Sequence, residues 1–358
     1  MNRTFDINKL VRPNIRDMAP YSSARDEFEG EARIFLDANE NSFGSLAGSN
    51  YNRYPDPRQN ILRNKVAELK GVAANQVFFG NGSDEPIDLL FRAFCQPQKD
   101  RVLIFPPTYG MYKVQAIIND TPVDEILLND DFSLPLDKIE QVINPNIKLL
   151  FICSPNNPSG NLIDKSAILA VLKCFKGIVV VDEAYIDFAK EGSMLPEINN
   201  YPNLVILQTF SKAWGMAGLR LGMAFAQPGI INILNKIKYP YNINSLTQKY
   251  VLETLQRANE KDIMVEKILK QRTWLIKELE KLEFVDTIYP SDANFLLVRM
   301  NGATQIYNKL TELGIIVRNR SSVALCNNCL RITVGTAAEN KEMVEQLVLV
   351  AKETLTIV

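Results

Sequence analysis

The sequence predicts an α/β protein in which a mostly parallel, seven-stranded sheet lies between helices, with a smaller α+β domain and an N-terminal arm. Between residues 77 and 225, short apolar segments alternate with polar turns and amphipathic helices, as in successive βαβ units. Beyond residue 284, the order changes to strands in succession with intervening helices. The 358 residues also exceed the length of one average domain, which favours two domains.

The N-terminal arm and part of the smaller domain are expected to span residues 1–45. A short helix is predicted near Ile7–Leu10 and a strand at Arg33–Leu36. A turn-rich linker with two prolines then leads to a helix over residues 58–70. This helix is expected to end at Gly71, because glycine commonly closes a helix.

The large domain is expected to span residues 46–255. Its predicted strands are 77–79, 102–105, 123–127, 148–153, 178–181, 205–209 and 221–225. Its predicted helices include 84–94, 109–118, 136–142 and 165–175. A parallel sheet of this kind is covered on both faces and binds ligands beyond the carboxyl ends of its strands.

The smaller domain is expected to span residues 256–358, and a helical stretch over 228–280 crosses its start. Its predicted strands begin near Phe284 and continue at 294–299, 315–318 and 330–334. Its predicted helices lie at 305–313 and from Ala338 onward.

The composition excludes several kinds of site. The chain has no histidine, which removes Ser/His/Asp triads and histidine-ligated metals. The Cys326–Cys329 pair has no second pair to complete a zinc site, and five cysteines do not form a disulfide framework. The net charge of −1 gives no support for a nucleic-acid or membrane partner. Because the chain has no histidine and no second cysteine pair, we expect no metal site. Because it has no signal-peptide-like run and no long apolar segment, we expect a cytoplasmic protein.

Lys212 lies between two segments that are predicted to be buried strands, 205–209 and 221–225. Burial disfavours the ammonium form and leaves a nucleophilic amine, which can form a Schiff base with an aldehyde such as pyridoxal 5′-phosphate. The alternative is an exposed lysine, because most lysines lie on the surface.

Three loops that follow predicted strands carry polar groups. Residues 80–86 contain two glycines, and Ser83 can cap the next helix, so this loop is either a phosphate site or a plain helix start. Residues 153–160 combine two prolines with two asparagines, although a simple turn would also explain them. Asp182 ends an apolar strand, where its carboxylate needs a protonated pyridine nitrogen, a helix cap or a salt bridge as partner.

In the type and spacing of its polar residues, the chain resembles the fold-type I aminotransferases that use pyridoxal phosphate. The residues that carry this resemblance are Asn157, Asp182, Tyr185, the pair Ser211–Lys212 and Arg220. The resemblance covers nearly the whole chain. Within that superfamily the chain looks like the histidinol-phosphate aminotransferase family. The segments that carry this closer resemblance are Asp37–Asn41, Asn52–Pro55, Pro106–Tyr112, Asp182–Ile186, Ala293–Leu296 and Cys329–Gly335.

The resemblance implies roles around the cofactor ring. Lys212 would bind the cofactor covalently and carry a proton between the substrate and the cofactor. Asp182 would pair with the pyridine nitrogen and make the ring an electron sink. Asn157 and Tyr185 would hold the phenolic oxygen, and Tyr109 would stack on the ring face.

The resemblance also implies which residues hold anions. The cofactor phosphate would be bound by Ser83, the amide of Asp84, Ser211 and Arg220. Tyr54 would reach the phosphate of the cofactor that is bound in the partner subunit, which implies a homodimer. Arg331 would hold the carboxylate of the amino donor and, with Arg318, the substrate phosphate, while Tyr21 would line the pocket.

The implied reaction interconverts L-histidinol phosphate and 2-oxoglutarate with imidazole-acetol phosphate and L-glutamate, a step of histidine biosynthesis. An aromatic amino acid aminotransferase or a threonine-phosphate decarboxylase on the same scaffold is an alternative. A non-catalytic ligand-binding module is a further alternative, but the chain shows no basic patch or DNA-binding domain to accompany it.

Overall fold

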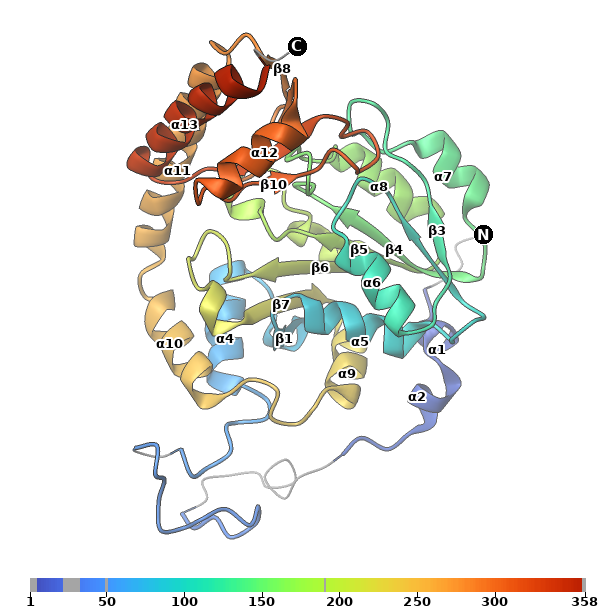
Figure 1. Cartoon of the computed structure of the whole chain (residues 1–358). Helices are drawn as coiled ribbons and strands as arrows, with labels where there is room; N and C mark the ends of the chain where they lie inside the picture. The colour runs from blue at the N-terminus through green and yellow to red at the C-terminus, as the bar shows by residue number, and fades with distance from the viewer. Residues whose placement is uncertain (1–4, 22–32, 49–50, 190, 356–358) are drawn as a thin grey trace.

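A seven-stranded sheet forms the centre of the protein in the computed structural model, which describes residues 5–21, 33–48, 51–189 and 191–355 (Figure 1). In sheet order the strands are β1 (Val77–Asn81), β7 (Leu221–Ala226), β6 (Leu204–Thr209), β5 (Ile178–Asp182), β4 (Ile147–Cys153), β2 (Arg101–Ile104) and β3 (Val123–Glu125). Strand β7 is antiparallel to both of its neighbours, and the other pairs are parallel. The predicted fold class is therefore confirmed.

Helices cover both faces of this sheet because its central strands are apolar over most of their length. In β5, Val179 and Val181 pack into the core on one face, and Ile178 and Val180 into the core on the other. The first face is covered by α4 (Asn60–Lys70), α7 (Leu136–Val142), α8 (Lys165–Cys174) and α10 (Ser245–Leu255). The second face is covered by α5 (Asp84–Phe94), α6 (Met111–Ile118) and α9 (Pro228–Ile237).

A second, antiparallel sheet lies beside the first, in the order β10-β11-β9-β8. Its strands are β8 (Val285–Ile288), β9 (Phe295–Met300), β10 (Arg318–Asn319) and β11 (Cys329–Thr333). The helices α11 (Ala258–Leu279), α12 (Ala303–Glu312) and α13 (Ala337–Leu355) pack with it around a separate core and lie together in Figure 1. The domain boundaries after residues 45 and 255 stay predictions.

The N-terminal segment differs in part from its prediction. The short helix α1 (Ile7–Leu10) is present, and α2 (Pro13–Asp17) follows it. The strand expected at 33–36 is wrong: these residues pair with no strand in the described part of the chain, and Ile34 and Leu36 are 67% and 83% exposed. Likewise, residues 315–317 are not strand, because β10 begins at Arg318.

The start of α5 brings the chain to the edge where the candidate site lies. Gly80 and Gly82 flank the end of β1, and Gly82 adopts a φ of +67°, which favours glycine. A Cβ on Gly222 of β7 would lie 2.3 Å from the Gly82 carbonyl carbon, so only glycine allows the two chains to approach this closely.

Candidate active site

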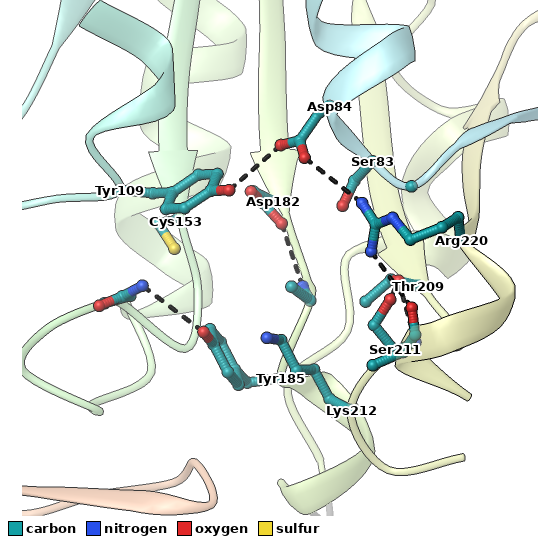
Figure 2. A pocket seen from close by; sticks show the side chains of 14 residues that line it. Ser83, Asp84, Tyr109, Cys153, Asp182, Tyr185, Thr209, Ser211, Lys212 and Arg220 are labelled. Carbon is teal, nitrogen blue, oxygen red and sulfur yellow. Dashed lines mark hydrogen bonds and ion pairs between the residues drawn. The ribbon is translucent and has the colours of Figure 1, made fainter. Parts of the chain in front are cut away.

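A cavity lies at the edge of the large sheet where β1, β4, β5 and β6 end and β7 begins (Figure 2). The cavity and its open mouth together enclose about 610 Å³ of empty space. Nine of the predicted site residues line it: Lys212, Asp182, Tyr185, Asn157, Tyr109, Ser83, Asp84, Ser211 and Arg220. The structure thus brings together side chains from five separate segments of the chain.

Lys212 lies on the loop between β6 and β7, and Figure 2 shows its amine directed into the cavity. The amine is 5.5 Å from the centre of the Tyr185 ring. The side chain is open to the cavity, yet the atoms around it desolvate the amine and lower its pKa. The positive charge of Arg331 lowers this pKa further, whereas Asp182 opposes both effects.

Asp182 is the last residue of β5 and is buried at the inner end of the cavity. Tyr112 donates its hydroxyl proton to Oδ2 at 2.8 Å, and the Ala184 amide donates to Oδ1 at 3.1 Å. Burial raises the pKa of Asp182 to about 6, and the bond from Tyr112 acts against this rise. Within the described residues Asp182 has no cationic partner at ion-pair distance, so an incoming cation would fill that role.

Arg220 and the start of α5 meet at one corner of the cavity. The Arg220 carbonyl accepts from the Gly82 amide at 2.8 Å, and its guanidinium lies 3.7 Å from the Asp84 carboxylate. The expectation that Ser83 caps α5 is wrong, because its side chain makes no capping hydrogen bond and lines the cavity instead. The first amides of α5 are therefore not satisfied by Ser83, and they favour an anion at this helix start.

Asn157 and Tyr185 lie side by side, and the Asn157 amide group donates to the Tyr185 hydroxyl at 3.5 Å. The carbonyl oxygen of Asn157 accepts a hydrogen bond from Arg331 of β11. Arg331 itself lies over the Phe295 ring, 5.2 Å from its centre. This contact joins the smaller sheet to the cavity of the large one.

Tyr109 lines the cavity from the segment before α6. Its hydroxyl donates to the Asp84 carboxylate at 3.1 Å, and its ring meets the edge of Tyr112 at 5.5 Å. Burial and the charge of Asp84 both raise the Tyr109 pKa, so the phenol stays protonated. A ring held by these two contacts offers a flat face to an aromatic ligand.

Three predicted residues lie away from this cavity in a single chain. Tyr54 stacks on Tyr241 at 4.4 Å and lines a separate hollow formed by residues 38–40, 47, 51–55, 241 and 244–246. Tyr21 is 70% exposed. Arg318 is exposed on β10, directly opposite Arg331 in the strand pairing.

Sequence reasoning missed several residues at the site. Cys153 and Thr209 line the cavity because they end β4 and β6, so the strand-end rule that indicated Asp182 also applies to them. Tyr112 could have been noticed as one helical turn beyond Tyr109. Arg320 has no comparable signal, because its position depends on the turn after β10.

The donor set fits a phosphorylated pyridine aldehyde. Asp182 offers a buried carboxylate to a ring nitrogen, and Tyr109 offers a ring face. Arg220 and the start of α5 offer cationic and amide donors to a phosphate, while Lys212 offers an amine to an aldehyde. These groups lie around one cavity.

The fold and the cavity together define a class of protein, the fold-type I aminotransferase-like proteins. More particularly, the chain belongs to the aminotransferase class I and II family, which matches residues 29–347. It is 54% identical to the histidinol-phosphate aminotransferase of Cytophaga hutchinsonii, over 96% of this chain and 99% of that one. It is 51% identical to the histidinol-phosphate aminotransferase of Parabacteroides distasonis, over 96% and 98% of the two chains.

Solved structures share the same fold. The histidinol-phosphate aminotransferase of Clostridium acetobutylicum matches with a TM-score of 0.78 and 25% identity, over 84% of this chain and 91% of that one. The histidinol-phosphate aminotransferase of Sinorhizobium meliloti, solved in complex with pyridoxal-5′-phosphate, has a TM-score of 0.78 at 23% identity. That match covers 88% of this chain and 90% of that one.

Proposed function

We propose that this protein is a pyridoxal 5′-phosphate-dependent transaminase that interconverts L-histidinol phosphate and 2-oxoglutarate with imidazole-acetol phosphate and L-glutamate, in histidine biosynthesis. The observation that carries the proposal is that Lys212 and Asp182 line one cavity, at the edge of the sheet where ligands bind. The identity of about 50% to relatives named for this reaction supports the choice of substrate.

The chain supplies the groups that this chemistry needs. When bound, the cofactor withdraws electrons from the substrate Cα–H bond. Lys212, whose pKa is lowered by burial, accepts and returns the proton at Cα. Asp182 in its ionised form keeps the ring nitrogen protonated, and the donors from Tyr112 and Ala184 orient its oxygens.

The remaining site residues bind and orient. Asn157 and Tyr185 donate to the phenolic oxygen of the cofactor, and Tyr109 stacks on its ring. Ser83, the amide of Asp84, Ser211 and Arg220 bind its phosphate. Arg331 binds the carboxylate of glutamate through its planar fork of donors, and Arg318 takes part in binding the phosphate of the second substrate.

We further propose a homodimer in which each subunit completes the other's site. Tyr54 lies outside the cavity of its own chain, and Phe43 and Leu46 beside it are fully exposed. A partner that covers this segment would bring its own cavity to Tyr54, and would bring Tyr21 toward the substrate.

A cytoplasmic location is supported by five unpaired cysteines. No helix among the described residues is long and apolar enough to cross a membrane.

The test is a substrate comparison on the purified protein with its cofactor. We expect turnover of histidinol phosphate that requires 2-oxoglutarate, at least about tenfold more efficient than turnover of phenylalanine. Replacing the amine in Lys212→Ala should abolish turnover while the protein still folds, as checked by circular dichroism. Release of carbon dioxide without any 2-oxoacid would instead indicate a decarboxylase, and normal activity of Lys212→Ala would refute the assignment.

A further inference from the structure

Three arginines gather at the β10–β11 edge of the smaller sheet, on one of its faces. Arg318 and Arg331 are directly opposite each other in the pairing of β10 with β11. Arg320 follows just beyond β10, where its amide donates to the Cys329 carbonyl at 2.8 Å and so continues the pairing. Because side chains alternate along a strand, Arg318 and Arg320 share a face, and Arg331 lies on that face as the partner of Arg318.

This face is turned toward the large domain. On the opposite face, Leu330 belongs to the core beneath α12 and α13, and Asn319 donates to Thr304 of α12 at 3.1 Å. Cys329 and Leu297 have the same orientation as the arginines, and both pack into the core of the large sheet. The arginine cluster therefore points away from the helices of its own domain.

The charge of Arg320 has no anionic partner in the described part of the chain. Its side chain is half-buried, and its Nε is buried without a hydrogen-bond partner there. Burial, and then the positive charges of Arg331 and Arg318, lower its pKa. A guanidinium in this position stays ionised, and an anion that reached it would relieve both the burial cost and the repulsion within the cluster.

The cluster borders the cavity on the side of Tyr185. The charges of Arg331 and Arg320 both act on the Tyr185 hydroxyl and lower its pKa, against a larger rise caused by burial. Arg331 also reaches the cavity directly, through its hydrogen bond to Asn157. An anion attached to a substrate in the cavity therefore meets a surface with three positive charges.

We propose that Arg320 is a specificity-determining residue that binds the terminal phosphate monoester of the substrate, an inference that rests on the proposed function. A phosphate dianion has more charge and more acceptor oxygens than a carboxylate, so it gains more from an additional guanidinium. Arg331 is already bound to Asn157 and is suited to the carboxylate of the donor. Arg320, with its free donors, supplies the discrimination between phosphorylated and unphosphorylated amino alcohols.

The test compares L-histidinol phosphate with L-histidinol as amino donors to 2-oxoglutarate, using the cofactor-loaded enzyme. In Arg320→Gln, we expect kcat/KM for histidinol phosphate to fall about tenfold or more, through loss of charge-assisted hydrogen bonds. The value for histidinol should change by less than about threefold, because it has no phosphate to lose. Arg320→Lys should fall between the two, since it keeps the charge and loses the planar fork.

Arg299→Gln is the matched control. Arg299 is another half-buried arginine of the smaller sheet, and its buried Nε also has no hydrogen-bond partner among the described residues, but its guanidinium lies 5.4 Å from the centre of the Tyr289 ring. We expect this variant to keep the preference for the phosphorylated substrate. An equal loss with both substrates in Arg320→Gln, or an unchanged preference, would overturn this inference alone. A wild-type enzyme without any preference for the phosphate would overturn the proposed function as well.

Discussion

At the scale of single residues, the buried carboxylate of Asp182 depends on a neighbour that does not itself line the cavity. Tyr112 is fully buried, its ring stacks on Phe151 at 4.7 Å, and its hydroxyl donates to Asp182 at 2.8 Å. The same ring supports Tyr109 by an edge contact. One side chain of α6 thus orients both the carboxylate and the aromatic face that the proposed cofactor would meet.

We predict that Tyr112→Phe weakens cofactor binding by about tenfold at pH 7, because a hydrogen bond to a charged group is lost while the ring packing is kept. The donor lowers the pKa of Asp182, which burial has raised to about 6, so its removal raises this pKa further. Asp182 is then less ionised near neutrality, and the acid side of the cofactor-affinity profile should move to higher pH. Titrating the cofactor-free protein with cofactor across pH 5–8 measures this, and an unmoved profile would contradict it.

At the scale of elements, β7 allows Arg220 and the start of α5 to meet at one corner of the cavity. It runs antiparallel between β1 and β6, so it begins where they end. The loop that carries Lys212 and Arg220 therefore lies beside the loop that opens α5. Gly222 is the point of closest approach, with Gly82 and Ser83 of the neighbouring loop directly against it.

Gly222→Ala should displace the loop before α5, because the added methyl group would overlap backbone atoms that cannot rotate away. Overpacking of this kind costs about 1–3 kcal/mol of unfolding free energy. We expect a lower melting temperature and weaker cofactor binding, measured by thermal denaturation with and without cofactor. Gly218→Ala is the control, since a Cβ there meets nothing within 4 Å, and it should behave like wild type.

At the scale of the whole molecule, Tyr54 is one of three predicted site residues that lie away from the cavity of their own chain. Tyr54 lies with Tyr241 at a separate hollow, and the segment around it exposes large apolar side chains such as Leu36. In Figure 1 this segment extends below the main body of the protein. A symmetric pair of chains would cover these side chains and exchange Tyr54 between the two sites.

We predict that the protein runs as a dimer, at about twice the 40.4 kDa of one chain, in size-exclusion chromatography with light scattering. Tyr54→Phe should weaken cofactor binding although Tyr54 is absent from its own chain's cavity. Mixed refolding of Tyr54→Phe with Lys212→Ala should restore tight covalent binding in about one site of four. Tyr239→Phe, at an exposed tyrosine nearby, is the control, and a monomer with full cofactor affinity would refute the arrangement.

Local patterns account for most of the fold and for the site residues at strand ends. The apolar run before Asp182 indicated the burial of this residue, and the apolar runs around Lys212 indicated the edge of the sheet where it lies, because consecutive strands and helices leave few arrangements. The expected burial of Lys212 was wrong, since its side chain is open to the cavity. The strand expected at Arg33–Leu36 failed, since a short apolar run forms a strand only where a sheet edge can pair with it. Tyr112 escaped notice because its hydroxyl bonds to Asp182, 70 positions along the chain. Arg320 escaped notice because the group on which its charge acts, Tyr185, lies more than 130 positions away.

The hydrogen bond between Arg331 and Asn157 has a thermodynamic consequence. A carboxylate that binds Arg331 would compete for the N–H donors that now bond to Asn157. Asn157 also bonds to Tyr185, and these two residues are the ones proposed to hold the phenolic oxygen of the cofactor. The affinity for the amino donor and the affinity for the ring oxygen are thereby linked. By reciprocity, if the bound cofactor changes the affinity for the amino donor by some factor, the bound amino donor must change the affinity for the cofactor by the same factor.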